Sequence, residues 1–288
     1  MNRASTILTI LAVAIFVASG LLFAMEPLPR YSGMAANGMG YGLLGLDRIA
    51  PEPAPDLAMA MVRPRMNALW LLSMAVWAGL ALHAARLASQ QWRHEAAHAA
   101  CHTTPAGGAW PLSFAGPPTA GQMIAAHGRD HAPVELAPLT AALIAGALWP
   151  WVWVRHPVAG FLLAVAMLIA ALGAVIRGQR EGTRIRSSTA VGLFAGWATA
   201  ATYAGFASLM ASHLGLPTDV AGLSAMLLCA GTGVFVQWQV TDSPSYSIGL
   251  IWALVGLTAV TMAVEPAIAI GAVIAISGMA VAVVRAAT

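Results

Sequence analysis

The segment His94-Glu95-Ala96-Ala97-His98 places two histidines and a glutamate at the spacing of a helical zinc site. On a helix, histidines four residues apart share one face and can bind zinc, and the glutamate can act as a general base. Zinc catalysis also needs a third protein ligand and an open position for water, and His102, His127 or His131 could supply that ligand. The alternative is an alanine-rich helical extension of the preceding apolar segment. Because the motif lies outside every apolar segment, we expect at most metal binding, by His94, His98 and His102.

His83 lies well inside an apolar segment, where an ionisable side chain is a candidate for function. A neutral imidazole at this position could ligate the metal of a haem or a chlorin. Arg86 and the end of the segment lie about one helical turn away. The alternative is therefore a histidine that reaches toward the interface or hydrogen-bonds locally.

The ten tryptophans are many for a chain of 288 residues. Trp197, Trp238 and Trp252 fall, together with Tyr203, in or near the ends of the last apolar segments. Such aromatic residues can line a pocket for a flat apolar ligand, and packing in the core is the alternative. Three more tryptophans alternate within residues 149–153, beside an arginine, and this pattern predicts an aromatic belt at the membrane interface.

The composition determines which elements must position these residues. Hydrophobic residues make up 59% of the chain and charged residues 9%, whereas a soluble domain carries about 25% charged residues. A hydrocarbon layer of about 30 Å requires roughly 20 apolar residues per helix. We therefore predict an all-α, polytopic transmembrane helix bundle with about eight spanning helices, at residues 5–25, 66–88, 137–154, 157–176, 188–211, 219–240, 246–264 and 266–284.

The predicted spans divide the chain into two regions. Residues 1–136 contain two spans and two long loops, and residues 137–288 contain a six-helix bundle. Arginines in short loops mark the cytoplasmic side of a membrane protein, and four arginines lie between positions 177 and 186. This loop follows the fourth of the eight predicted spans, so an even number of spans separates it from each terminus. Both termini are therefore expected in the cytoplasm.

Small residues recur every four positions in the span at 188–211, at Gly192, Gly196, Ala200 and Ala204. A stripe of this kind lets helix backbones approach closely. It predicts helix packing, either within the bundle or across a dimer.

The run Gly196-Trp197-Ala198-Thr199-Ala200-Ala201-Thr202 resembles the G-W-x-[ST]-x-A-T stretch of bacterial tryptophan-rich sensory proteins. These are longer relatives within the TspO/MBR (translocator protein) family. Leu148-Trp149 and the run Trp252–Gly256 fit the same family, and the resemblance covers about residues 137–286. It implies an all-helical bundle, often dimeric, that binds tetrapyrroles or sterol-like ligands and acts as a sensor or regulator.

Carried over residue by residue, the resemblance makes Trp197, Tyr203 and Trp252 candidate pocket residues, to which we add Trp238 and His83. It also implies a bacterial cytoplasmic (inner) membrane as the location. The compact members of the family have five helices, whereas this chain has eight predicted spans.

No Asp, Glu or Arg falls in the middle of a predicted span, which argues against proton pumps and ion-coupled carriers. We therefore predict an integral membrane protein, not an enzyme, that binds a hydrophobic planar ligand, with a tetrapyrrole as the candidate. Its output would be sensory, regulatory or transport. The expected partners are membrane lipids and either a second copy or a larger complex. No nucleic-acid partner is expected, because the basic residues form no stripe or face.

Two alternatives stay open. One is an accessory subunit of a larger respiratory or photosynthetic membrane complex, and the other is a zinc-dependent membrane enzyme that uses His94, Glu95 and His98.

Overall fold

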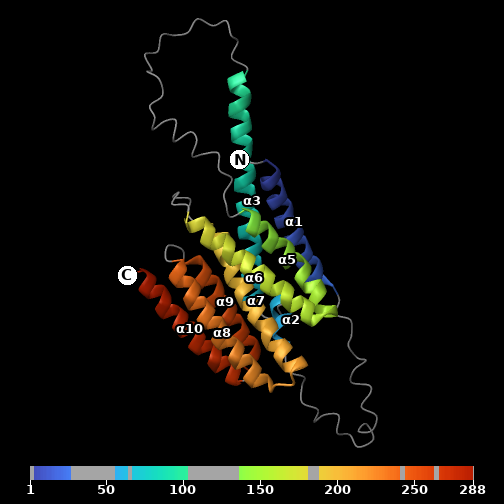
Figure 1. The fold of residues 1–288 in the computed structure, drawn as a ribbon, viewed down its shortest axis with the longest axis vertical. Coiled ribbons are helices and arrows are strands. Elements are labelled where there is room, and N and C mark those ends of the chain that lie inside the picture. The colour runs from blue at the N-terminus through green and yellow to red at the C-terminus, as the bar shows by residue number, and fades with distance from the viewer. Residues whose placement is uncertain are drawn as a thin grey trace, which may run out of the picture.

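The described residues of the computed structural model are 3–26, 56–63, 67–102, 136–180, 188–240, 244–262 and 266–287. They form helices and contain no strand (Figure 1). In chain order the helices are α1 (Arg3–Met25), α2 (Leu57–Val62), α3 (Asn67–His102), α5 (Leu136–Arg155), α6 (Pro157–Arg180), α7 (Thr189–His213), α8 (Thr218–Gln239), α9 (Ser245–Thr261) and α10 (Pro266–Ala287). The predicted all-α fold is confirmed.

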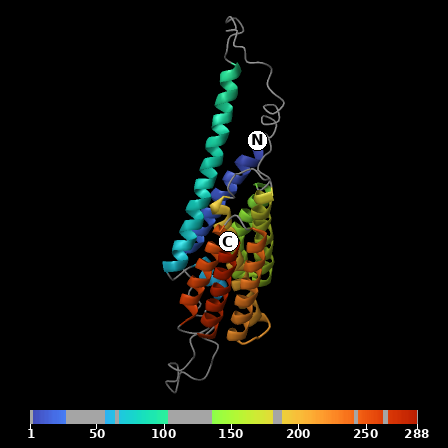
Figure 2. The same ribbon diagram turned by 90° about the vertical axis from the view of Figure 1, so that its left-hand side faces the viewer.

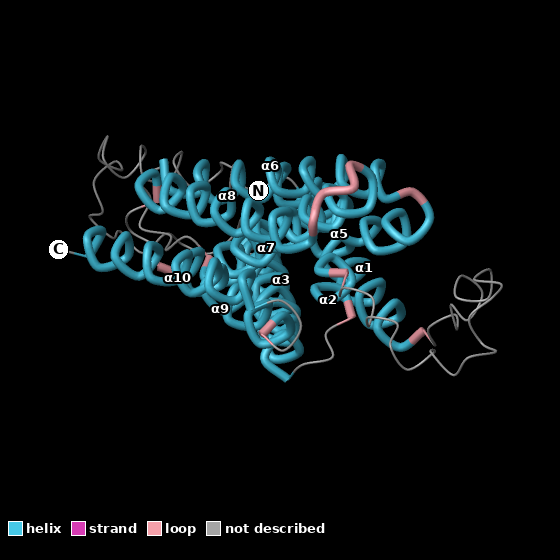
Figure 3. Tube along the Cα trace, turned by 90° about the horizontal axis from the view of Figure 1, so that it is seen from below, coloured by secondary structure: helices cyan, strands magenta, loops and turns pink. Residues whose placement is uncertain are grey.

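Among the described residues, six helices are long and apolar enough to cross a membrane: α1, α3, α5, α6, α8 and α10. They coincide with six of the predicted spans. The other two predicted spans are α9, an apolar helix of 17 residues, and α7, which has 25 residues. Seen end-on, α7 lies in the middle of the bundle (Figure 3), and most of its residues are buried. Its glycines, alanines and threonines therefore face other helices.

Two local features differ from the predicted pattern. The short helix α2 lies in the stretch predicted as a long loop, and α3 continues to His102, well past the predicted end of its span. Figure 2 shows α3 extending beyond the other helices. Pro150 lies inside α5, within the predicted span at 137–154. Proline removes one backbone hydrogen bond from a helix, but α5 continues for another turn.

Helix α1 is attached to α5 by polar contacts spread along its length. The hydroxyls of Thr9 and Thr140 lie 2.8 Å apart. About three turns further along, Ser19 donates a hydrogen bond to the carbonyl of Ala147 at 2.6 Å and accepts one from the indole of Trp151 at 2.9 Å. Because apolar burial does not drive helices together in lipid, such hydrogen bonds and close packing must hold the pair.

The small-residue stripe of α7 faces α9 at its first two positions. A side chain at Gly196 would meet the carbonyl oxygen of Tyr246 and, at 2.7 Å, the backbone nitrogen of Leu250. On the other helix, a side chain at Gly249 would lie 2.8 Å from the carbonyl oxygen of Leu193. The two backbones are therefore in direct contact. Gly192 faces the side chain of Ser245 in the same interface, and Ala200 and Ala204 are buried.

We predict that Gly196→Ala destabilises the protein, because the added methyl group meets backbone atoms that no rotamer change can move. The expected loss is about 1–3 kcal/mol, which lowers the thermal unfolding midpoint in detergent by roughly 2–10 °C.

Gly231→Ala is the matched control, because no atom lies within 4 Å of the new methyl group in α8. Alanine favours a helix over glycine by about 1 kcal/mol, so this variant should be neutral or slightly stabilised. Equal midpoints for the two variants would contradict the α7–α9 packing.

Candidate ligand cavity

A cavity of about 30 Å³ lies where five helices meet. α1, α2 and α3 contribute to its wall together with α5 and α7, and none of the lining side chains is charged. The lining residues are Phe16, Gly20, Met61, Val62, Ser73, Val76, Trp77, Gly146, Trp149, Pro150 and Trp197. This volume holds one or two water-sized groups.

Aromatic rings form the wall of the cavity around Trp197. The ring of Trp197 stacks on Phe194 with centroids 6.1 Å apart. It also meets Phe16 of α1 at 6.0 Å and Trp149 of α5 at 6.1 Å, both edge to face. Such pairs stabilise by about 0.5–1.5 kcal/mol each beyond their burial. The cluster therefore fixes the relative positions of α1, α5 and α7 beside the cavity.

Two glycines let the large rings approach. A side chain at Gly20 of α1 would lie 2.7 Å from the Cζ2 atom of Trp77. A side chain at Gly146 of α5 would lie 2.9 Å from Phe16 and 3.1 Å from the sulfur of Met167. Each glycine thus provides the space that an aromatic ring from another helix fills.

Two polar groups face this apolar environment. The indole Nε1 of Trp149 is buried and has no hydrogen-bond partner among the described residues. An unpaired buried N–H costs about 1–3 kcal/mol, so its presence requires an explanation. Ser73 of α3, another lining residue, is also buried.

Helix α2 covers the cavity with Met61 and Val62, and its N-terminus is fixed by Asp56. The Asp56 carboxylate accepts hydrogen bonds from the backbone nitrogens of Ala58 and Met59 at 3.0 and 3.3 Å, as an N-cap residue does. It also accepts a bond from the hydroxyl of Ser208 in α7 at 2.6 Å. This end of α2 is therefore tied to α7.

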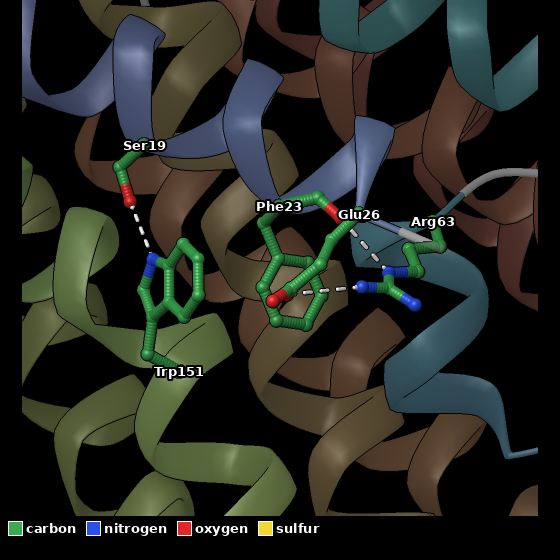
Figure 4. A network of polar contacts seen from close by, with 5 residues as sticks. All are labelled: Ser19, Phe23, Glu26, Arg63 and Trp151. Carbon is green, nitrogen blue, oxygen red and sulfur yellow. Dashed lines mark hydrogen bonds and ion pairs between the residues drawn. The ribbon is translucent and has the colours of Figure 1, made fainter. Parts of the chain in front are cut away.

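The C-terminal end of α2 is tied to α1 by Arg63 (Figure 4). The Nε atom of Arg63 donates to the carbonyl of Phe23 at 3.0 Å, and its Nη2 lies 3.5 Å from the carboxylate of Glu26. The guanidinium also lies 4.4 Å from the centre of the Phe23 ring. Figure 4 also shows the Ser19–Trp151 bond, one turn before Phe23 along α1. The six-residue helix is thus held at both ends by charged side chains.

Comparison with known proteins assigns the larger part of this architecture to a family. Residues 127–285, more than half of the chain, match the family of TSPO-like proteins. The chain belongs to the TSPO-like family. No curated protein and no solved structure matches the chain. The family and the long apolar helices identify an integral membrane protein of the TspO type, and the resemblance seen in the sequence is confirmed.

The cavity lies at the boundary of the TSPO-like region. Gly146, Trp149, Pro150 and Trp197 fall within the matched residues, and the other lining residues come from α1, α2 and α3. The N-terminal helices therefore complete a site that the TSPO-like helices form only in part.

The structure brings one of the predicted ligand residues to this cavity. Trp197 lines it and has 8% of its surface exposed. Tyr203, two turns along α7, instead shares a hydrogen bond of 2.5 Å with Thr232 of α8. Trp252 of α9 donates to the carbonyl of Ala68 in α3 at 3.0 Å. Both side chains link helices outside the cavity wall.

The remaining predicted ligand residues also lie elsewhere. Trp238, at the end of α8, has 64% of its surface exposed. His83 is partly buried in α3, and its Nε2 atom has no partner among the described residues. Neither residue lines the cavity.

The predicted aromatic belt at 149–153 is wrong for two of its three tryptophans. Trp149 and Trp153 are buried in the core, because α1, α6 and α7 pack around this part of α5. Trp151 has 37% of its surface exposed and is the one that could reach lipid headgroups.

For the histidine motif, the structure describes the backbone and not the side chains. α3 is helical through His94, His98 and His102, as the alternative of a helical extension predicted, but these side chains lie outside the described residues, as do His127 and His131. Among the described residues no group of three His, Cys, Asp or Glu side chains could hold a metal ion. Zinc binding by the motif stays a prediction.

Sequence reasoning missed the cavity residues of α1, α2 and α3. Phe16 and Trp77 lie in spans that are apolar on all sides. Because these spans have no polar face, their sequences do not show which side faces the other helices. The available signal was the small residues Gly20 and Gly146, which allow close approach of a large ring. Which ring would occupy each space becomes apparent only in three dimensions.

We predict that Arg63→Ala increases the opening of α2. The substitution removes a charge-assisted hydrogen bond, worth about 1.5–3 kcal/mol, so the open fraction should rise roughly tenfold or more. A cysteine placed at Met61, which lies on the buried face of α2, reports opening through its rate of maleimide labelling in a Cys101→Ser background.

Arg93→Ala is the control, because Arg93 lies on the exposed part of α3. The account predicts an unchanged labelling rate for this variant. If Arg63→Ala labels Met61→Cys no faster than the control does, then Arg63 does not hold α2 in place.

Proposed function

We propose that this protein binds a hydrophobic planar ligand at the aromatic cavity, with a tetrapyrrole as the candidate, and that binding has a sensory, regulatory or transport output. The observation that carries the proposal is the set of rings from Phe16, Trp149 and Trp197 around an internal space inside a membrane protein. Aromatic faces and edges suit a flat apolar molecule. Membership of the TSPO-like family favours binding over catalysis.

The size of the cavity requires movement during binding. Ligand pockets measure about 300–1,000 Å³, ten times or more the volume of this one. Among the elements of the wall, α2 is the shortest, with six residues, and polar contacts at its two ends tie it to α7 and α1. Displacing α2 would remove Met61 and Val62 from the wall and open the space between α1, α3 and α7. The present arrangement therefore corresponds to a closed state.

The membrane orientation follows from the arginines at the helix ends. If all eight long helices cross the membrane, the beginning of α1 and the ends of α3, α6 and α10 lie on the same side. These ends carry Arg3, Arg93, Arg177 and Arg285. By the positive-inside rule, this arrangement supports the proposal that both termini are cytoplasmic. The resemblance to bacterial relatives supports a bacterial cytoplasmic membrane as the proposed location.

The proposal predicts saturable binding of a porphyrin to the purified protein in mild detergent. Trp197→Ala should weaken binding at least about tenfold, since removal of a central aromatic contact typically costs about 2 kcal/mol or more. Quenching of porphyrin or tryptophan fluorescence during titration measures the affinity.

Trp92→Ala is the matched control, because Trp92 has 77% of its surface exposed on the distant part of α3. Its affinity should equal that of the unmodified protein. The absence of saturable binding, or equal losses in the two variants, would end the proposal.

A further inference from the structure

Trp149 differs from other tryptophans of the bundle in the state of its indole N–H. Trp151, two residues along α5, donates to Ser19 at 2.9 Å, and Trp252 donates to the carbonyl of Ala68 at 3.0 Å. The Trp149 indole has none of its surface exposed, and its Nε1 has no acceptor among the described residues. Because a buried donor without an acceptor is rare in a folded protein, this N–H marks a place where an acceptor belongs.

Trp149 lines the cavity, so a ligand that enters it could supply the acceptor. Ser73 lines the same cavity from α3 and is buried. The other lining side chains are aliphatic, aromatic, glycine or proline. The side chains with a polar group that border this space of about 30 Å³ are thus Ser73 and three tryptophans, Trp77, Trp149 and Trp197. Among these, Trp149 is the one whose Nε1 is buried without a partner among the described residues.

The lack of charge in the wall defines which acceptor suits this place. In the closed state the space of about 30 Å³ holds only an oxygen-sized group, so the ring system enters when α2 moves. A carboxylate would be desolvated with no cation in the wall, which is strongly unfavourable. A neutral carbonyl or ester oxygen can accept from the indole N–H without that cost.

We propose that the cavity binds the neutral oxygen acceptor of the ligand, with the indole Nε1 of Trp149 as donor and Ser73 beside it. The inference rests on the proposed function, and it makes Trp149 a specificity-determining residue. A flat apolar ligand that carries a carbonyl arm is then bound more tightly than the same ring system without one. The rings of Trp197 and Phe16 contact the apolar part.

Two neutral porphyrins test this inference in the full-length protein. Mesoporphyrin IX dimethyl ester and etioporphyrin III share the macrocycle and its alkyl groups, except that two ester arms replace two ethyl groups. The ester should bind about tenfold more tightly, which corresponds to about 1.4 kcal/mol. Trp149→Phe keeps an aromatic ring but removes the donor. It should reduce this preference to about twofold, because both porphyrins lose the same ring contact and only the ester also loses the hydrogen bond.

Trp153→Phe is the matched control. Trp153 lies on the same helix, is buried, and packs against Trp149 with ring centroids 6.3 Å apart, but it does not line the cavity. This variant should retain the full preference for the ester. A preference that survives Trp149→Phe, or equal binding of both porphyrins to the unmodified protein, would overturn the inference and leave the proposed function standing. If neither porphyrin binds, the proposed function fails and the inference fails with it.

NMR spectroscopy of the indole N–H groups detects the hydrogen bond to the ligand directly, independently of any effect of the substitution on folding. In protein labelled with ¹⁵N-tryptophan, the indole resonance that is missing from Trp149→Phe identifies Trp149. Both macrocycles shift this resonance by their ring current, and the hydrogen bond should place it further downfield with the ester than with etioporphyrin III. An indole resonance that responds equally to both compounds would also overturn the inference.

Discussion

The contact between α1 and α5 is the interaction on which the candidate site depends. Thr9 and Thr140 share a hydrogen bond near one end, and Ser19 bonds to Ala147 and Trp151 toward the other. Between them, Phe16 occupies the space that Gly146 leaves. In lipid, where apolar burial contributes little to helix association, these contacts must determine where α1 lies. Only with α1 in this position does the ring of Phe16 reach Trp197 and enclose the cavity.

Helix α7 lies at the centre of the bundle and contacts α9, the cavity and α2. One face of α7 meets α9 backbone to backbone at Gly196, and Trp197, the next residue, points to the cavity. Ser208, three turns further along, holds the start of α2 through Asp56. A single helix of the TSPO-like region, α7, therefore packs in the core, forms one wall of the cavity and holds one end of α2, the helix that covers the cavity. This explains how helices outside the family match become part of the same site.

The sequence predicts the helices of this protein better than it predicts the site. Long apolar runs and arginine-marked ends are local signals, and they predict α5, α6, α8 and α10 to within a few residues. The stretch Gly196–Thr202 also identifies the family. The cavity depends instead on which face of each apolar helix turns inward, and a helix that is apolar all round carries no such signal. Trp197 was predicted from its motif, whereas Phe16, Trp77 and the inward position of Trp149 follow from packing between distant segments. The short helix α2 was missed because six residues show no clear period.

The most direct test of this account is a disulfide between α1 and α5. Cysteines at Thr9 and Thr140 replace hydroxyls that lie 2.8 Å apart, which brings their Cβ atoms within the range of a disulfide. The native cysteines are replaced by serine, a protease site is inserted between α3 and α5, and the pair Thr9 and Thr258 serves as control. After mild oxidation and cleavage, the account predicts that the two fragments of the Thr9–Thr140 variant stay joined until reductant is added, while those of the control separate. Separation of both variants, or cross-linking only between two copies of the chain, would contradict the docking of α1 on which the cavity depends.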